Sequence, residues 1–257
     1  AGYRFTLAGV LTIVLGSILQ RKILLPKRSA IGKIGLLSLL QTVLQYLFFY
    51  IGLAHTTGVK ASIIEAVSTF VAILVAGYLF HQETVTSRKM LGCLIGFAGV
   101  VLVNVAGSGM DFHFSPAGDG CILLSTVAYA FSSVCMKRFS QKEDPVMLSG
   151  YQFILGGIVM IACGGAMGGH LKAFTASAAA LLIYMAMISA VAYSLWGMLL
   201  KYNPVSKVTV FGFMNPVIGV ILSALLLDET EALGVSSVLA LGLVCVGIYI
   251  VNAKAKE

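Results

Sequence analysis

Long apolar runs alternate with short polar connections along the whole chain. A helix needs about 20 mainly apolar residues to cross the hydrocarbon core of a bilayer. Nine runs meet this requirement, at residues 4–20, 33–54, 58–80, 88–105, 117–136, 147–168, 177–200, 205–227 and 233–252. The pattern therefore predicts an all-α integral membrane protein with nine transmembrane helices in this chain.

The second half of the chain repeats the first. Residues 3–10 (Tyr3-Arg4-Phe5) match residues 151–158 (Tyr151-Gln152-Phe153) at a shift of 148 positions. Residues 99–104 match residues 247–252 at the same shift. A repeat of apolar spans is typical of transporters, in which two similar halves move about a site held between them.

The repeat also predicts how many helices the natural protein has. The first repeat covers residues 1–105 and the second covers residues 116–252, where a run at 117–136 precedes the matching segments. The first repeat has no counterpart of that run, so we expect an additional helix before residue 1 and ten helices in full. Each repeat would then hold five helices. Because five is odd, the two repeats would lie in the membrane with inverted topology.

Composition excludes a soluble protein and a nucleic-acid-binding protein. Hydrophobic residues make up 59% of the chain and charged residues 11%, whereas a soluble domain carries about 25% charged residues. The five cysteines lie inside apolar runs and form no disulfide framework. The net charge of +7 comes from basic residues at the ends of the runs, where they orient a membrane protein.

The basic residues predict the orientation. With residue 1 outside, 14 of the 17 Lys and Arg residues fall on the cytoplasmic side, and the C-terminus is cytoplasmic. Only Arg4, Lys60 and Lys172 fall outside. We expect a multi-pass protein of the plasma membrane.

Several motifs together resemble a known family. In the first repeat they are Gly52-Leu53-Ala54-His55-Thr56-Thr57-Gly58, Leu79-Phe80-His81-Gln82-Glu83-Thr84 and Leu91-Gly92-x3-Gly96-x2-Gly99. In the second they are Gly118-Asp119-Gly120, Leu200-Lys201-Tyr202-Asn203-Pro204, Asn215-Pro216-Val217 and Leu227-Asp228-Glu229-Thr230. In their order and spacing they resemble the drug/metabolite transporter superfamily and its EamA-type ten-helix members.

The resemblance implies transport of small solutes across the plasma membrane, usually export, from a central cavity between the repeats. Two departures from the family pattern are visible. The first helix, which helps to line that cavity in the family, is missing from this chain. Phe70 stands where the family often has proline and where the second repeat has Pro216.

Polar residues inside the spans are candidates for a solute site. Glu65 is the only carboxylate well inside a span, and such groups by default point inward and mark a pathway or proton relay. Ser62, Ser68 and Thr69 share its helical face at spacings of three and four. The alternative is a protonated carboxyl that is bonded within the bundle or reaches the outer rim near Lys60.

Three further polar stripes are candidate cavity linings. They consist of Gln41, Gln45 and Tyr46, of Tyr129 with Ser125, Ser132 and Ser133, and of Tyr193 with Trp196. Polar stripes in lipid face other helices or a cavity, and hydrogen bonds between helices alone would also explain them. Tyr193 and Trp196 have a second interpretation as interfacial anchors.

Pro216 is the candidate hinge. It lies near the middle of the span at 205–227, lacks an N–H group, and so leaves the carbonyl of Gly212 without its helical partner. A freed carbonyl beside Asn215 is a binding element or a kink satisfied by neighbouring helices. Glu83 and Glu229 occupy matching positions at span ends, and we interpret them as exposed residues near the start of the next helix.

These patterns predict a secondary transporter of small organic metabolites, amino-acid-like or amphipathic, that works by alternating access. Its predicted partners are the solute and the lipid bilayer, with protons as the candidate coupling ion. The scattered histidines predict no metal site, and no motif indicates a cofactor or an enzyme. A membrane scaffold or a channel-like protein remains the alternative, since fold alone does not decide function.

Overall fold

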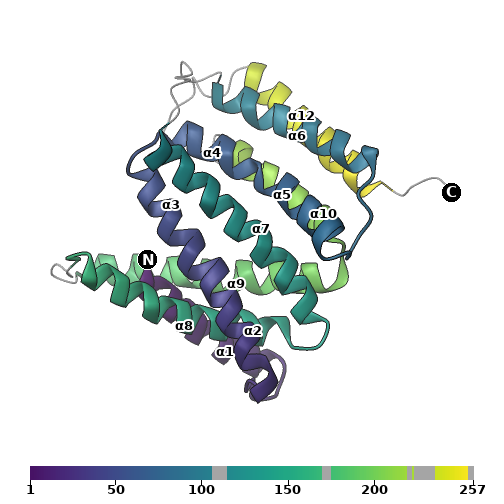
Figure 1. Cartoon of the computed structure of the whole chain (residues 1–257). Coiled ribbons are helices and arrows are strands. Elements are labelled where there is room, and N and C mark those ends of the chain that lie inside the picture. The colour runs from purple at the N-terminus through teal and green to yellow at the C-terminus, as the bar shows by residue number, and fades with distance from the viewer. Residues whose placement is uncertain (106–114, 170–174, 219–221, 223–234, 254–257) are drawn as a thin grey trace. The chain divides into compact units, whose positions relative to one another are not determined.

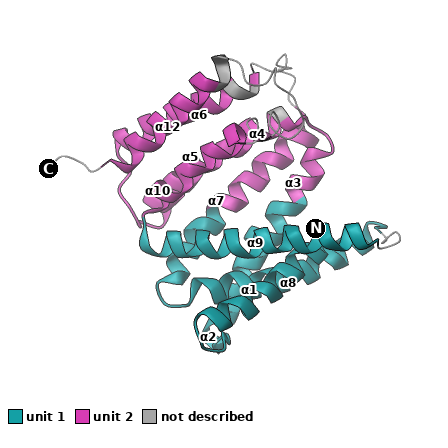
Figure 2. Ribbon diagram, turned by 180° about the vertical axis from the view of Figure 1, so that it is seen from behind, with its two compact units in different colours: residues 1–47, 131–203 teal, residues 48–130, 204–257 magenta. Residues whose placement is uncertain are grey.

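The computed structural model describes residues 1–105, 115–169, 175–218, 222 and 235–253. These residues are helical, with short connections and no strand among them (Figure 1). The chain forms two compact units (Figure 2). Unit 1 comprises residues 1–47 and 131–203, and unit 2 comprises residues 48–130 and 204–257. Each unit therefore contains segments of both predicted repeats.

Six helical stretches are long and apolar enough to cross a membrane within the described part of the chain. They are Gly2–Leu19, Arg28–Leu53, Lys60–Leu79, Pro116–Ser140, Pro145–Ala166 and Ala176–Tyr202. Two shorter apolar helices cover Val205–Ile218 and Val238–Asn252. The predicted span at 205–227 is thus described as far as Ile218, and most of its remainder lies outside the described residues.

The stretches are subdivided by local changes in winding. In chain order the elements are α1 (Gly2–Leu19), α2 (Arg28–Leu37), the π-helix η1 (Ser38–Leu44), α3 (Gln45–Leu53), α4 (Gly58–Ala66), α5 (Ser68–Leu74), the π-helix η2 (Val75–Leu79), α6 (Ser87–Val105), the π-helix η3 (Pro116–Gly120), α7 (Cys121–Ser140), α8 (Pro145–Ala166), α9 (Ala176–Tyr202), α10 (Val205–Thr209), the 3-10 helix η4 (Val210–Phe213) and α12 (Val235–Asn252).

Capping residues explain where helices begin. The Asp144 side chain accepts hydrogen bonds from the N–H groups of Val146 and Met147, at 2.9 and 3.1 Å. Pro145 follows as the first helical residue of α8, where its missing N–H is not needed. Thr175 caps α9 in the same way through the N–H of Ala178. These polar groups satisfy free helix ends that the apolar pattern does not reveal.

In unit 1, α1 packs antiparallel against α8 through glycines. A Cβ atom at Gly9 would lie 2.6 Å from the Gly150 carbonyl oxygen, and one at Gly157 would lie 2.9 Å from the Gly2 carbonyl oxygen. Such close approach of two backbones is open only to small residues. The shift of 148 relates Gly9 to Gly157 and Gly2 to Gly150, so it converts each of these contacts into the other.

The same relation holds in unit 2, where α6 and α12 run side by side (Figure 1). A Cβ at Gly92 would lie 2.9 Å from the Gly247 carbonyl oxygen, and one at Gly99 would lie 2.8 Å from the Ala240 carbonyl oxygen. Residue 92 contacts residue 247 and residue 99 contacts residue 240, so these helices are also antiparallel. The shift of 148 again exchanges the two contacts.

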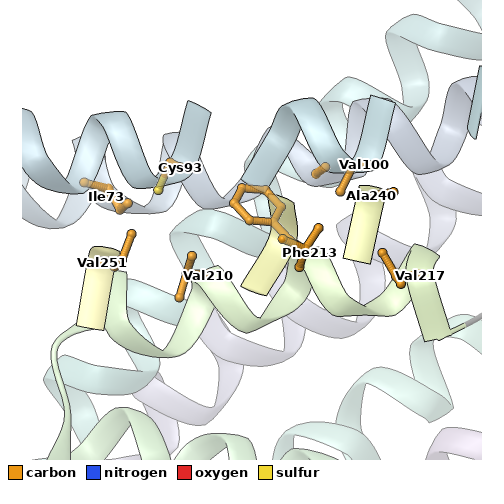
Figure 3. Close-up of a cluster of buried hydrophobic side chains, with 10 residues drawn as sticks. Ile73, Cys93, Val100, Val210, Phe213, Val217, Ala240 and Val251 are labelled. Atoms are coloured by element: carbon orange, nitrogen blue, oxygen red, sulfur yellow. The ribbon is translucent and has the colours of Figure 1, made fainter. Parts of the chain in front are cut away.

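The core of unit 2 forms around Phe213 of η4 (Figure 3). Its ring fills the space that Gly96 leaves open on α6, because a Cβ at Gly96 would lie 2.5 Å from the ring. Phe70 of α5 packs against Phe213 and against Phe97, with ring centroids 6.4 and 5.7 Å apart. Burial of these aromatic and aliphatic side chains joins α5, α6, η4 and α12 into one core.

The sequence led us to interpret Glu83 as an exposed residue near the start of the next helix, and the structure shows that this interpretation is wrong. Its side chain is only 5% exposed and accepts hydrogen bonds from the Ser206 N–H (2.9 Å) and hydroxyl (2.5 Å). Lys89 at the start of α6 forms an ion pair with it at 2.7 Å. Glu83 thus caps the first turn of α10, a helix distant in sequence, rather than the helix that follows it. Glu229 lies outside the described residues.

Candidate functional site

Unit 1 contains a π-helical segment in the middle of the stretch Arg28–Leu53. The segment is η1, and it carries Gln41 and Thr42, which are both completely buried. A π-helix widens the helical turn and occurs frequently at functional sites. Thr42 packs closely on α8, where a Cβ at Gly156 would collide with its side chain. The local winding thus places polar side chains against α8, a helix of the second predicted repeat.

A pair of glutamine amides lies at this contact. Gln152 of α8 donates a hydrogen bond from Nε2 to Oε1 of Gln41 at 2.5 Å. Both side chains are 0% exposed. An amide pair in an apolar bundle replaces the hydrogen bonds that each group would otherwise make with water, and so joins the two helices.

An aromatic cluster lies one turn further along. The hydroxyls of Tyr46 (α3) and Tyr193 (α9) are hydrogen-bonded at 2.6 Å. The Phe5 ring lies 4.4 Å from the Tyr46 ring and 5.2 Å from the Phe153 ring, which in turn lies 4.8 Å from Tyr193. The Arg4 guanidinium covers Phe5 at 4.4 Å and Tyr46 at 5.5 Å, within the range of cation–π attraction.

Several buried polar atoms of this cluster have no hydrogen-bond partner among the described residues. They are Gln41 Nε2, Thr42 Oγ1, Gln45 Oε1, Gln152 Oε1 and Arg4 Nε. A buried polar atom without a partner costs free energy, and native proteins keep few of them. These atoms are concentrated in one region of unit 1. We call Gln41, Thr42, Gln45, Tyr46, Gln152 and Tyr193 the amide–tyrosine site.

The structure thus brings together four of the predicted solute-site residues, namely Gln41, Gln45, Tyr46 and Tyr193. Trp196 follows Tyr193 on α9 and is half-buried in the same unit. Ser133 also belongs to unit 1, where it is fully buried and its hydroxyl has no partner among the described residues. Tyr129, half-buried on α7, belongs to unit 2.

Glu65, Ser68 and Thr69 lie in unit 2, on either side of a change in helical winding. The α-helix stops at Ala66 and starts again at Ser68, with a turn at Val67 whose N–H bonds to the Ile64 carbonyl. Thr69 is buried and donates to the Thr209 carbonyl at 3.1 Å, whereas Glu65 is exposed. The turn at Val67 lies within the continuous helical stretch Lys60–Leu79, and the common face of these residues stays a prediction.

The candidate hinge at Pro216 lies beside a change in helical winding that matches the one at Val67 in the first repeat. Gly212 lies in the 3-10 segment η4, which directly precedes the α-helical residues 214–218 that include Pro216. Glu83-Thr84 matches Glu229-Thr230 at a shift of 146, two less than the shift of the flanking segments. This shift relates Phe213 at the end of η4 to Val67 in the first repeat, so both related spans change winding at the same place. Pro216 is half-buried, and Asn215 is exposed. The turn at Val67 in the first repeat contains no proline, so such a change in winding does not require a proline.

Three residues of the polar and aromatic cluster in unit 1 were not predicted from the sequence, namely Gln152, Thr42 and Arg4. A signal for Gln152 was present, since it is an amide inside a predicted span and the shift of 148 aligns it with Arg4. The same shift aligns Phe5 with Phe153, which are in ring contact. Within the described residues, no group of three or more His, Cys, Asp and Glu side chains is arranged to hold a metal ion.

Comparison with known proteins gives related transporters. The chain is 26% identical to an uncharacterized transporter, YvbV, of Bacillus subtilis, over 100% of this chain and 82% of that protein. It is 28% identical to an uncharacterized inner membrane transporter, YedA, of Escherichia coli, over 99% of this chain and 83% of that protein. It is also 28% identical to a WAT1-related chloroplastic protein of Arabidopsis thaliana, over 78% of this chain and 50% of that protein.

A solved crystal structure has the same fold, with a TM-score of 0.81 at 20% identity over 97% of this chain and 86% of the other. The model of the EamA-like transporter family matches residues 1–105 and 116–253. The match leaves out residues 106–115 and 254–257. Together with the apolar helices, it shows that the chain belongs to the EamA-like transporter family and is a multi-pass membrane protein.

Proposed function

We propose that this chain is a secondary transporter that exports small organic metabolites, amino-acid-like or amphipathic, across the plasma membrane. The observation that carries the proposal is the amide–tyrosine site in unit 1. Its hydrogen-bonded pairs, Gln41 with Gln152 and Tyr46 with Tyr193, each join a residue of the first predicted repeat to one of the second. A site made by both repeats is what a carrier with alternating access requires.

The chemistry of the site supports a solute with polar and apolar parts. The free amide and hydroxyl atoms supply hydrogen-bond donors and acceptors without formal charge, and Arg4 adds a cation that suits a carboxylate. The neighbouring rings of Phe5 and Phe153 supply an apolar surface. An amino acid or a similar amphipathic metabolite has groups that match each part.

The glycine contacts support inverted repeats at residues 1–105 and 116–252. A two-fold axis in the membrane plane makes equivalent helices antiparallel and turns each contact between them into its repeat equivalent. The pairs Gly9–Gly150 and Gly2–Gly157 behave in this way in unit 1. The contacts of Gly92 with Gly247 and of Gly99 with Ala240 do so in unit 2. The basic residues support an outer residue 1 and a cytoplasmic C-terminus.

Exchange in liposomes tests the proposal. The full-length protein is purified, reconstituted, loaded with unlabelled amino acids, and assayed for accumulation of each labelled amino acid by counterflow. We expect saturable exchange of a subset of neutral or zwitterionic solutes. Gln152→Leu should lower this exchange by about tenfold or more, since one hydrogen bond lost from a buried site is worth about 1.4 kcal/mol.

Gln141→Leu is the matched control, because Gln141 is an exposed glutamine of the same unit and lies outside the amide–tyrosine site. It should exchange solute at the unchanged rate. Equal losses in both variants would remove the site from the proposal. A protein that folds yet gives no saturable exchange of any amino acid or amphipathic metabolite would support the scaffold alternative.

A further inference from the structure

The connection between α1 and α2 carries basic and large apolar side chains at the ends of two membrane spans (Figure 1). The stretches Gly2–Leu19 and Arg28–Leu53 are both long and apolar enough to cross a membrane. The residues that join them therefore lie where the spans leave the hydrocarbon, at the depth where lipid headgroups meet acyl chains. We call residues 20–28 the α1–α2 loop.

The α1–α2 loop is fixed to α1 by one buried leucine. Leu24 is 3% exposed and fills the space beside Gly16, where a Cβ would lie 2.9 Å from the leucine side chain. Its N–H donates a hydrogen bond to the Ser17 hydroxyl at 3.2 Å. The N–H of Lys22 donates to the Ser17 carbonyl at 3.1 Å, and Arg21 turns the backbone with a left-handed φ of 51°. The loop therefore presents its other side chains from a backbone that is held in place.

The residues on either side of Leu24 are turned away from the protein. Ile23 is 79% exposed and Leu25 is 69% exposed. Large aliphatic side chains at the end of a membrane span are stabilised by burial at the boundary between headgroups and acyl chains, as in helices that lie in the interface. The exposure of this pair therefore favours contact with lipid.

The loop also carries an excess of positive charge. Residues 20–28 contain four basic residues and no acidic one. The basic residues are Arg21, Lys22, Lys27 and Arg28. All except Lys22 are exposed and form no ion pair with a described residue. Three cations are therefore available to a ligand of opposite charge.

The carboxylates of the neighbouring α7–α8 connection do not neutralise these three cations. Asp144 pairs with Lys22 at 3.5 Å, which places this connection beside the α1–α2 loop. Glu143 is 7% exposed and pairs with Lys33 at 2.6 Å. Each carboxylate is thus matched by a lysine other than the three exposed cations, and the excess of positive charge remains.

We propose that the α1–α2 loop binds the headgroups of anionic phospholipids, with Ile23 and Leu25 inserted among the acyl chains below them. Arg21, Lys27 and Arg28 meet the phosphates, because guanidinium and ammonium groups bind phosphate oxygens through charge-assisted hydrogen bonds. One basic residue near an anionic membrane surface strengthens binding about fivefold. Three such residues beside an inserted apolar pair give the loop a preference for anionic over zwitterionic lipids.

Quenching of a single tryptophan by brominated lipids tests the proposal. Trp196 is the one tryptophan of this chain, so Trp196→Phe with Ile23→Trp places the fluorophore in the α1–α2 loop. The protein is reconstituted in mixtures of phosphatidylglycerol and phosphatidylcholine in which one or the other lipid is brominated. We expect phosphatidylglycerol to be preferred at position 23 by about fivefold or more. Arg21→Gln, Lys27→Gln and Arg28→Gln together should lower that ratio to near one.

Two controls make the result specific. Trp196→Phe with Leu155→Trp reports on an exposed side chain within α8, outside the loop, and should give a ratio near one. Lys201→Gln with Lys207→Gln removes two charges outside the loop and should leave the ratio at position 23 unchanged. A ratio near one at position 23 with the loop cations intact would overturn the proposal. So would a preference that the triple variant retains or that the two lysine changes lower equally, and so would the absence of quenching by either lipid.

Thermal unfolding in detergent repeats the comparison without a change at Trp196. Added phosphatidylglycerol should raise the unfolding temperature of the unaltered protein more than added phosphatidylcholine does, because a ligand that binds only the folded state stabilises it. The triple variant should lose that difference. Equal shifts with the two lipids in the unaltered protein, or a difference that the triple variant keeps, would count against the loop as the binding surface.

Discussion

Tyr46 and Tyr193 share a 2.6 Å hydrogen bond between their hydroxyls, although 147 positions separate them in the chain. That separation differs by one from the shift that relates the two repeats, so the bond joins nearly equivalent positions. The Phe5 and Phe153 rings, which are strictly equivalent, stack beside it at 5.2 Å. Residues that face a two-fold axis meet their own repeat equivalents, and this supports our proposal that unit 1 carries part of the solute site.

The tyrosine pair should act as a unit. Tyr46→Phe and Tyr193→Phe should each lower the free energy of unfolding by about 1 kcal/mol, since each leaves a partly buried hydroxyl without this partner. The double variant should lose little more than either single variant, because the second change removes a bond that is already broken. Thermal unfolding in detergent measures all three. Strictly additive losses would contradict the pairing, and Tyr184→Phe, at an exposed position on α9, should be neutral.

The glycine contacts of α1 and α8 predict that substitutions at the two contacts destabilise the protein by similar amounts. Gly9→Ala and Gly157→Ala should each destabilise the protein by about 1–3 kcal/mol, because each new methyl group would overlap the opposite backbone. The two losses should be similar, since the contacts are equivalent under the shift of 148. Gly164→Ala is the control on α8, where a Cβ meets no neighbouring atom. Resistance to unfolding by detergent reports the difference, and a loss at only one of the two contacts would argue against the symmetry.

The Glu83 carboxylate should matter more than an exposed ion pair. Glu83→Gln should cost about 1–3 kcal/mol, because it weakens the bonds to Ser206 and removes the carboxylate charge that pairs with the Lys89 ammonium. Lys22→Gln is the contrast, since Lys22 is 57% exposed and pairs with Asp144 at 3.5 Å, a geometry that contributes little. Unfolding midpoints of the two variants give the comparison. A loss in Lys22→Gln as large as that in Glu83→Gln would refute the distinction.

Pro216→Ala tests the predicted hinge. Alanine restores an N–H that can donate to the Gly212 carbonyl, so this part of the helix should become stiffer. We expect solute exchange to slow several-fold while the unfolding temperature stays the same or rises. Exchange kinetics and thermal unfolding are measured on the same preparation. An unchanged rate would show that η4 owes its winding to packing, as the break at Val67 does, and that Pro216 is no hinge.

Glu65→Gln tests whether a carboxylate inside a span couples transport to protons. A protonatable group there can carry a proton through the transport cycle, whereas an amide cannot. We therefore expect Glu65→Gln to keep solute exchange but lose its response to a pH gradient across the liposome. Glu143→Gln, at a connection between helices, should retain that response. The same pH profile before and after the change at Glu65 would exclude this residue as the coupling group.

Much of the fold could be predicted from the sequence, because helices in lipid must satisfy every backbone hydrogen bond internally and so appear as apolar runs of sufficient length. Most predicted spans coincide with described helices to within a few residues. The prediction was less accurate where capping groups extend a helix, as Asp144 does at α8. It did not reveal the turn at Val67 between Glu65 and Thr69, because hydropathy does not show a change from α-helix to turn.

The sequence by itself determined the membrane-spanning helices, the duplication, the family resemblance and four members of the amide–tyrosine site, because each depends on residue type and spacing along one element. Only the tertiary structure decided that Gln152 meets Gln41 and that Glu83 caps a distant helix. Those relations join residues from different elements, and they depend on how the helices pack. Close glycine contacts and local π-helical winding set that packing, and neither produces a regular spacing of residue types along the sequence.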